Sequence, residues 1–316
     1  MNAVGVSQAE EFSATFPDPI QATVTYRRLA SHEIKADLYR TPDDRRCPVV
    51  VWIHGGALMM GHREQVHREV KKLAAQRGYA LLSIDYRLAP ETELPEIISD
   101  LEAAFQWIEK EGAGQFHLNP KRIAFIGGSA GGYLPLTTGY CVQPWPKALV
   151  AFYGYGDLTG DWCMKPSPHP RHHRIEMDAK SAAAQSGGTV VSDARKRRGN
   201  GGLIYLHARQ TGTWPQRVSG FGEANFRSRI VAFEPHRHVS VEYPPILLIH
   251  GTEDSNVPHE QSLLMAQALR QYGVPQRLIS LENGEHEFGG SDEREVSAAY
   301  RTMCAFVIEA LEPKPD

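Results

Sequence analysis

The sequence predicts an α/β fold, with a mostly parallel central sheet and flanking helices. Six short apolar runs, rich in Val, Ile and Leu, lack polar alternation and are typical of strands buried on both faces of such a sheet. Amphipathic stretches of helical length separate most of these runs, and this alternation defines the α/β class. The predicted strands cover residues 48–56, 79–87, 122–128, 148–154, 244–251 and 276–283.

The predicted helices cover residues 64–76, 96–110, 130–141, 259–272 and 293–311. In the second of them, Leu101, Ala104 and Ile108 recur at helical spacing and form one apolar face. Two more polar runs, residues 23–30 and 33–40, come before the first buried strand. They predict an antiparallel pair at one edge of the sheet.

Residues 155–243 interrupt the alternation, because they separate two predicted strands by far more than an ordinary crossover. This segment holds 13 of the 34 Lys and Arg residues but only 8 of the 37 Asp and Glu residues. We therefore expect it to be an inserted cap or lid after the sixth strand. The core domain would then comprise residues 1–154 and 244–316.

Composition narrows the class of protein. The chain has 316 residues, 41% of them hydrophobic and 22% charged, with a net charge of −3, which does not favour a nucleic-acid partner. Its four cysteines lie far apart and predict free thiols. Residues 1–16 lack the pattern of a signal peptide, and no apolar run could span a membrane. We expect a cytoplasmic protein, and a homo-oligomer remains open.

The stretch "FIGGSAGGY" surrounds Ser129 with glycines at the junction of a predicted strand and a predicted helix. Residues 127–131 match the pattern G-x-S-x-G, in which a sharp turn projects a nucleophilic serine. Gly127 and Gly131 are needed where a Cβ would clash, and the N-terminus of the following helix favours an oxyanion nearby. The pattern also occurs by chance, so alone it does not establish catalysis.

Three further motifs follow other predicted strands. "WIHGGALMMG" (52–61) offers unobstructed backbone N–H groups that could bind an oxyanion. "HGTEDSNVP" (250–258) holds Asp254, and "ENGEHEFGG" (282–290) holds His286. Ser129, Asp254 and His286 come in this order, each beyond the carboxyl end of a predicted parallel strand. Catalytic groups gather at that edge of α/β sheets.

With these motifs and with "DYRLAPE" (85–91), the chain resembles the α/β-hydrolase superfamily, and most closely its hormone-sensitive-lipase-like esterases. The resemblance implies the α/β-hydrolase fold and a Ser129–His286–Asp254 triad. It also implies an oxyanion hole formed by backbone N–H groups. One belongs to Ala130, and two belong to residues among Gly55, Gly56 and Ala57 of the motif "WIHGGALMMG". That group most often has His-Gly-Gly-Gly, and Ala57 replaces its third glycine.

Several other residues are candidates for a role. Glu253 is an alternative acid beside Asp254, and we expect Glu285 and Glu287 to lie in solvent. The basic run 194–198 predicts a solvated face that could attract anions. The histidines of "HPRHHR" lack the partner spacing of a metal site, so we expect no metal or other cofactor. The candidate substrate-pocket residues are Leu58, Met59, Tyr153, Trp162 and Trp214.

The sequence therefore predicts a serine hydrolase that cleaves a small-molecule carboxylic ester through an acyl-enzyme. An amidase or peptidase would use the same three residues and stays an alternative. A ligand-binding receptor on a hydrolase scaffold is a further alternative, although this chain keeps all three residues.

Overall fold

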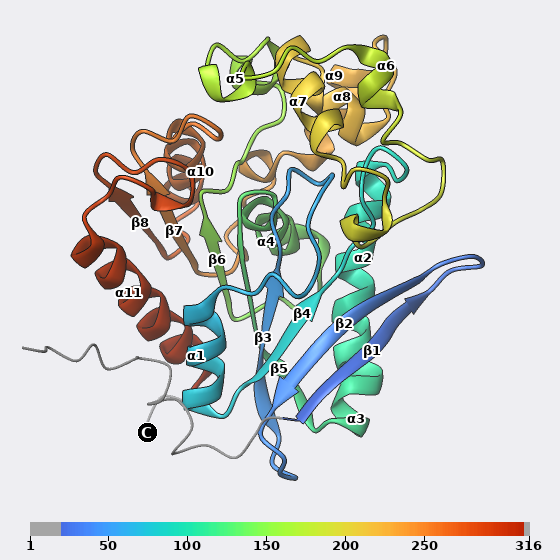
Figure 1. Ribbon diagram of the computed structural model, residues 1–316. Helices are drawn as coiled ribbons and strands as arrows, with labels where there is room; N and C mark the ends of the chain where they lie inside the picture. The colour runs from blue at the N-terminus through green and yellow to red at the C-terminus, as the bar shows by residue number, and fades with distance from the viewer. Residues whose placement is uncertain (1–19, 313–316) are drawn as a thin grey trace, which may run out of the picture.

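In the computed structural model, which describes residues 20–312, eight strands form one sheet in the order β1-β2-β4-β3-β5-β6-β7-β8 (Figure 1). The strand β2 runs antiparallel to β1 and β4, and every other pair of neighbours is parallel. The strands are β1 (Ile20–Arg28), β2 (Glu33–Arg40), β3 (Cys47–Ile53), β4 (Ala80–Ile84), β5 (Leu118–Gly128), β6 (Ala148–Phe152), β7 (Ile246–Gly251) and β8 (Gln276–Leu281).

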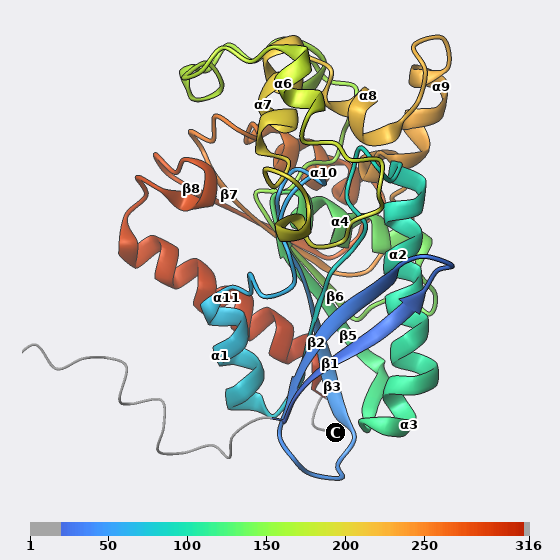
Figure 2. The same cartoon turned by 45° about the vertical axis from the view of Figure 1, so that its right-hand side comes forward.

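Helices cover both faces of the sheet (Figure 2). Apolar residues of α2, α4 and α10 pack with Val49, Val51 and Ile53 of β3 on one face. On the other face, residues of α1 and α11 pack with Val50 and Trp52. These helices are α1 (Arg68–Arg77), α2 (Leu94–Trp107), α4 (Ala130–Cys141), α10 (Glu260–Gln271) and α11 (Glu293–Leu311), and a short α3 (Ala113–Gln115) precedes β5.

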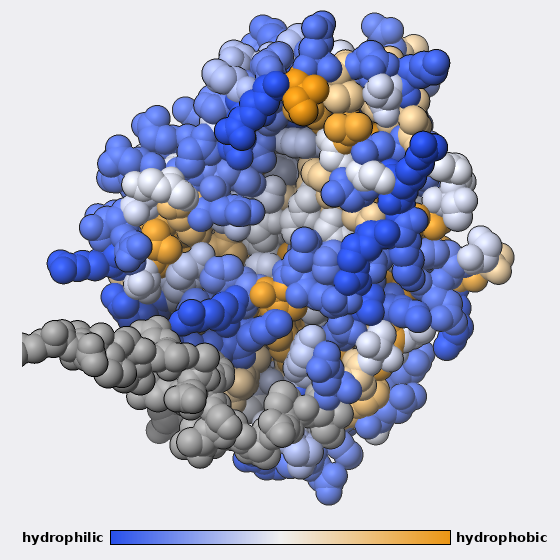
Figure 3. All heavy atoms as spheres, in the orientation of Figure 1, coloured by the Kyte–Doolittle hydropathy of each residue, from blue (hydrophilic) through white to orange (hydrophobic). Residues whose placement is uncertain are grey.

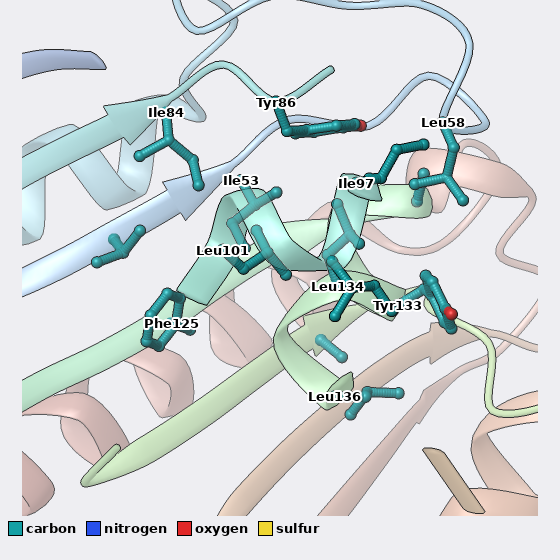
Figure 4. Close-up of a cluster of buried hydrophobic side chains, with 14 of the residues drawn as sticks. Ile53, Leu58, Ile84, Tyr86, Ile97, Leu101, Phe125, Tyr133, Leu134 and Leu136 are labelled. Atoms are coloured by element: carbon teal, nitrogen blue, oxygen red, sulfur yellow. The ribbon is translucent and has the colours of Figure 1, made fainter. Parts of the chain in front are cut away.

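Burial on both faces explains why the central strands carry no polar alternation. All seven residues of β3 are buried, and so are all five of β6. Figure 4 shows one of the two apolar layers, where Ile53 and Phe125 from the sheet meet Leu101 and Leu134 from the helices.

The predicted fold class is confirmed, and the element boundaries differ by a few residues. The run predicted as 79–87 leaves the sheet after Ile84, because Asp85 and Arg87 form ion pairs with other loops and helices instead of continuing the ladder. The helix predicted as 96–110 begins two residues earlier and widens into a π-helical turn at Ile108–Gly112.

Residues 155–243, the insertion, leave the sheet after β6 and return at β7. Figures 1 and 2 place the helices of the insertion over the carboxyl ends of the parallel strands. That it acts as a cap or lid stays a prediction. Its helices are α5 (Asp161–Met164), α6 (Ala179–Ala183), α7 (Gly202–Thr211), α8 (Trp214–Ser219) and α9 (Phe226–Ile230).

Figure 3 shows a mostly hydrophilic face, with apolar residues exposed in small separate patches. Within residues 20–312, no helix is long and apolar enough to cross a membrane. The four cysteines are free thiols, and two of them, Cys47 and Cys163, are buried. The signal-peptide prediction concerned residues 1–16, which lie outside the described residues.

Candidate active site

The turn between β5 and α4 holds Ser129 in a strained backbone conformation, with φ 58° and ψ −122°. A Cβ on Gly127 would lie 2.0 Å from the carbonyl oxygen of Gly131. A Cβ on Gly131 would lie 2.1 Å from the carbonyl oxygen of Ile53. Neither position could carry a larger residue without moving the backbone, so the two glycines of the motif permit this turn.

The structure brings together the three residues that the sequence predicted as a triad. The Nε2 atom of His286 lies 3.1 Å from the Oγ atom of Ser129. The Nδ1 atom of His286 lies 2.7 Å from an Oδ atom of Asp254. When Nδ1 carries the proton, it donates to Asp254, and Nε2 is free to accept the hydroxyl proton of Ser129.

Asp254 is buried, whereas Glu253 beside it is exposed. The second carboxylate oxygen of Asp254 accepts hydrogen bonds from the backbone N–H groups of Asn256 and Val257, at 2.8 and 2.9 Å. Burial alone would raise the pKa of Asp254, but hydrogen bonds from His250 and His286 outweigh it and hold the pKa well below its usual range. The geometry therefore favours Asp254 over Glu253 as the acid.

His250 contacts the same carboxylate oxygen of Asp254 as His286 does, and it is fully buried near the end of β7. Its Nε2 atom lies 2.9 Å from the carbonyl oxygen of Val257 and 3.3 Å from Asp254. Its Nδ1 atom lies 2.7 Å from the hydroxyl of Ser262. His250 thus contacts both the loop backbone and Asp254, and no sequence pattern predicted the contact with Asp254.

The expectation that Glu285 lies in solvent is wrong. Its carboxylate accepts hydrogen bonds from the backbone N–H of His286 at 2.6 Å, from the hydroxyl of Ser255, and from Arg171 of the insertion at 2.8 Å. Burial would raise the pKa of Glu285, and these contacts lower it overall. Glu285 thus links three loops around His286. Glu287 is exposed, as expected.

Residues 54–61, the glycine loop, follow β3 and lie against Ser129. Gly56, Ala57 and Leu58 have positive φ angles of 110°, 55° and 63°. A Cβ on Gly55 would lie 2.9 Å from the carbonyl oxygen of Gly128, so this residue must be glycine for the loop to approach the serine. Within residues 20–312, no carbonyl of the loops accepts a hydrogen bond from the N–H groups of Gly55, Gly56 or Ala57.

The insertion holds the glycine loop in this shape. The indole N–H of Trp214 donates a 3.1 Å hydrogen bond to the carbonyl oxygen of Ala57. Arg197 donates to the carbonyl oxygen of Met59 and forms an ion pair with Glu91, and both side chains of that pair are 2% exposed.

These contacts correct the prediction of a solvated basic face at residues 194–198 for Arg197 only, because Arg195, Lys196 and Arg198 are exposed as expected. Arg197 is buried and structural. Arg195 is exposed, but Glu64 and Asp193 neutralise it. Arg197 and Arg195 are therefore already paired and unavailable to attract an anion.

Two connected cavities adjoin Ser129. The outer cavity, about 610 Å³, is lined by Met60, Tyr153, His286 and other residues of the core. The inner pocket lies under the insertion and is lined by Tyr155, Trp162, Arg209 and Trp214, among others. Both cavities include Ala57, Ser129, Tyr205 and Asn256.

Three of the five predicted pocket residues line these cavities: Tyr153, Trp162 and Trp214. Leu58 and Met59 do not, because both side chains are fully buried in the apolar core. Figure 4 shows Leu58 directed toward Ile97 in that core. Positive φ angles at the preceding residues turn these two side chains inward, and Met60 reaches the cavity instead.

No sequence pattern indicated a role for Tyr205, Arg209 or Asn256. The amide oxygen of Asn256 accepts a 2.6 Å hydrogen bond from the hydroxyl of Tyr205 and lies 3.0 Å from Nε2 of His172. Only the position of Asn256, two residues after Asp254, could have drawn attention to it. Tyr205 and Arg209 lie four residues apart on α7, a spacing that also occurs on ordinary helix faces.

His172 of "HPRHHR" is buried and hydrogen-bonded to Ser167 and Asn256. In the part of the chain that the structure describes, no group of three or more His, Cys, Asp or Glu side chains could hold a metal ion.

Comparison with known proteins agrees with this architecture. Residues 36–174 match the family model BD-FAE, and residues 199–314 match the prolyl oligopeptidase family. A solved α/β hydrolase superfamily protein from Enterococcus faecalis has a TM-score of 0.71 at 24% identity, covering 92% of this chain and 99% of that one. Carboxyl esterase 2 from Tuber melanosporum has a TM-score of 0.65 at 21% identity, covering 98% and 90%.

Two relatives are similar in sequence. A non-reducing polyketide synthase of Emericella nidulans is 24% identical over 84% of this chain, which spans 13% of that synthase. The probable carboxylic ester hydrolase LipM of Mycobacterium tuberculosis is 28% identical over 74% of this chain, which spans 48% of LipM.

The chain has the α/β-hydrolase fold, as its sheet order and its structural neighbours show. Ester hydrolases are among the proteins to which the chain is similar, and this similarity is consistent with the hormone-sensitive-lipase-like group.

Proposed function

We propose that this chain is a serine hydrolase that cleaves carboxylic esters through an acyl-enzyme. The observation that carries the proposal is the continuous contact from Ser129 through His286 to Asp254. This contact lies beside backbone N–H groups that have no partner among the neighbouring loops of residues 20–312. The ester hydrolases among its structural neighbours support the same class of reaction.

In the proposed reaction, His286 accepts the proton of Ser129 while the Oγ atom attacks the ester carbonyl. Asp254 orients the imidazole and stabilises its protonated form. The N–H of Ala130 and two from Gly55, Gly56 and Ala57 would stabilise the oxyanion. One such donor typically lowers the barrier by about 3 kcal/mol. His286 then protonates the leaving alcohol, and water hydrolyses the acyl-enzyme by the same path.

An amidase or peptidase could use the same groups, and the match of residues 199–314 to the prolyl oligopeptidase family keeps this alternative relevant. We favour an ester because an alkoxide leaves more readily than an amine. Rates with an ester and an amide of the same acyl group distinguish the two activities.

The test of the proposal is hydrolysis of p-nitrophenyl esters of increasing acyl length by the wild type and by Ser129→Ala. We expect turnover by the wild type and loss of nearly all of it in the variant, because residues of such a triad act as a unit. The hydroxyl lies at a turn, so the melting temperature should hardly change. A folded Ser129→Ala protein with substantial activity would contradict the proposal.

A further inference from the structure

Arg209 differs from the other buried arginines of this protein. Within residues 20–312, four arginines are less than a tenth exposed: Arg40, Arg87, Arg197 and Arg209. The first three form ion pairs with carboxylates. Arg209, which is 4% exposed, forms none with any described residue. Its Nε atom has no hydrogen-bond partner there, as is also true of Arg197, so the missing carboxylate is what distinguishes Arg209.

A buried guanidinium without a counter-charge is costly. Arginine stays protonated in proteins, so it cannot escape the desolvation penalty by losing its charge. The ring of Trp162 lies 5.4 Å from the Cζ atom of Arg209 and offsets part of that penalty by a cation–π contact. The remaining penalty favours an anion or water beside the guanidinium.

Two more donors line the same pocket. The hydroxyl of Tyr155 and the indole N–H of Trp162 are buried, and within the described part of the chain neither has a hydrogen-bond partner. Together with Arg209 they line the inner pocket beside Ser129. Buried donors are normally satisfied, so three unsatisfied donors around one pocket favour an occupant with acceptor oxygens, either a water or the oxygen atoms of a ligand.

The position of the pocket indicates which part of the ester would occupy it. His286 lines the outer cavity but not the inner pocket. If His286 protonates the leaving oxygen, the alcohol part of the ester must lie toward the outer cavity. The acyl part then extends toward Arg209. The inner pocket has only about 10 Å³ of free volume, the space of one water. A carboxylate therefore enters it only if that water leaves and the surrounding side chains move apart, and the acyl part that carries the carboxylate must be short.

We propose that Arg209 binds the free carboxylate of a short dicarboxylic acid whose other carboxyl group forms the scissile ester. This inference rests on the proposed function and specifies its substrate class. The carboxylate would replace water at the inner end of the pocket, where Tyr155 and Trp162 add hydrogen bonds. The residue that would bind the anionic substrate, Arg209, thus lies outside the basic run 194–198.

The test compares monoethyl succinate with ethyl levulinate, a near-isosteric ester in which a neutral methyl ketone replaces the carboxylate. Monoethyl malonate and monoethyl glutarate extend the comparison to shorter and longer acids. The values of kcat/KM are measured for the wild type, Arg209→Gln, Arg209→Lys and Arg198→Gln. Arg198 is exposed and belongs to the same insertion, so it controls for a general loss of positive charge.

We expect the wild type to prefer at least one monoanionic ester over ethyl levulinate. Arg209→Gln should reduce that preference by about 30-fold or more, the usual effect of removing one partner of a buried charge pair. Arg209→Lys should keep part of it, and Arg198→Gln should keep all of it. The inference is overturned if no monoanionic ester is preferred, or if the preference survives in Arg209→Gln.

An equal loss of activity toward both ester types in Arg209→Gln would also overturn it, because that result indicates a structural role.

Calorimetric titration of monoethyl succinate into the Ser129→Ala protein separates this inference from the proposed function. Binding that disappears in Ser129→Ala/Arg209→Gln supports the carboxylate site even if no ester is hydrolysed. Hydrolysis of neutral esters without such binding supports only the proposed function.

Discussion

Asp254 lies between two histidines, and the difference between their environments predicts different roles. His286 contacts both Asp254 and Ser129, whereas His250 is buried behind the acid and reaches only Asp254, Val257 and Ser262. His286 is therefore the candidate base. His250 is a positioning residue that holds the carboxylate of Asp254 in its orientation.

Replacing the acid tests this arrangement at the scale of one residue. Asp254→Asn should lower kcat by about 10⁴-fold, because the amide no longer selects the histidine tautomer that can accept the serine proton. Glu253→Gln is the matched control and should leave kcat nearly unchanged, since that side chain is exposed. Steady-state kinetics on a neutral p-nitrophenyl ester measures both variants, and a reversed result would move the acid to Glu253.

The three residues of the proposed triad could be predicted to lie together because each follows a buried strand in a recognisable loop. Glu285 could not be predicted in this way. A glutamate between glycine and histidine looks solvated, and two of its partners, Arg171 and Ser255, lie 114 and 30 residues away in the sequence. Tertiary contacts of this kind leave no local pattern.

At the scale of elements, the strands and helices of the core follow from hydrophobic periodicity. The insertion does not, because its helices are short and several of its basic residues are buried by distant partners. Arg197 is the clearest example: its sequence context "ARKRR" suggests solvent, but Glu91 and two backbone carbonyls of other loops bind it.

Arg197→Gln and Arg195→Gln should therefore differ in stability. The first removes one partner of a buried ion pair, and such changes cost about 3–5 kcal/mol. The second removes an exposed ion pair, typically worth about 0–1 kcal/mol. Denaturant unfolding of both variants measures the difference. Equal effects would mean that the Arg197–Glu91 pair does not anchor the insertion.

At the scale of the whole molecule, the sheet order and the edge where the loops meet were predictable, because parallel buried strands with intervening helices permit few arrangements. Which side chains would be fully enclosed was less predictable. His54, the first residue of the glycine loop, directly follows β3, is fully buried and stacks on Tyr86 with 4.3 Å between the ring centroids. Burial lowers its pKa to about 4.

This lowered pKa predicts that acid destabilises the folded chain. As pH falls below about 6.5, the ordinary pKa of histidine, the unfolded chain takes up a proton at His54 that the folded chain does not. The free energy of unfolding should fall by up to about 1.4 kcal/mol per pH unit from this histidine, until pH approaches about 4.

Denaturant unfolding at several pH values measures this dependence. His54→Asn keeps a donor for the carbonyl oxygen of Gly55 and should give a flatter profile between those pH values. His172, whose pKa burial also lowers to about 4, contributes in the same direction and remains in the variant. An unchanged slope in His54→Asn would show that His54 does not titrate as its burial implies.

The insertion bonds to both sides of the reaction centre: to the glycine loop through Trp214 and Arg197, and to the loops of Asp254 and His286 through Arg171 and Tyr205. A chimaera that grafts another hydrolase's insertion onto this core would lose all of these supports at once. Replacing the whole insertion to change the proposed substrate selectivity would therefore also change the rate of the proposed reaction. Natural or engineered changes of substrate are then expected to proceed by single substitutions in the pocket wall, with the segment itself retained.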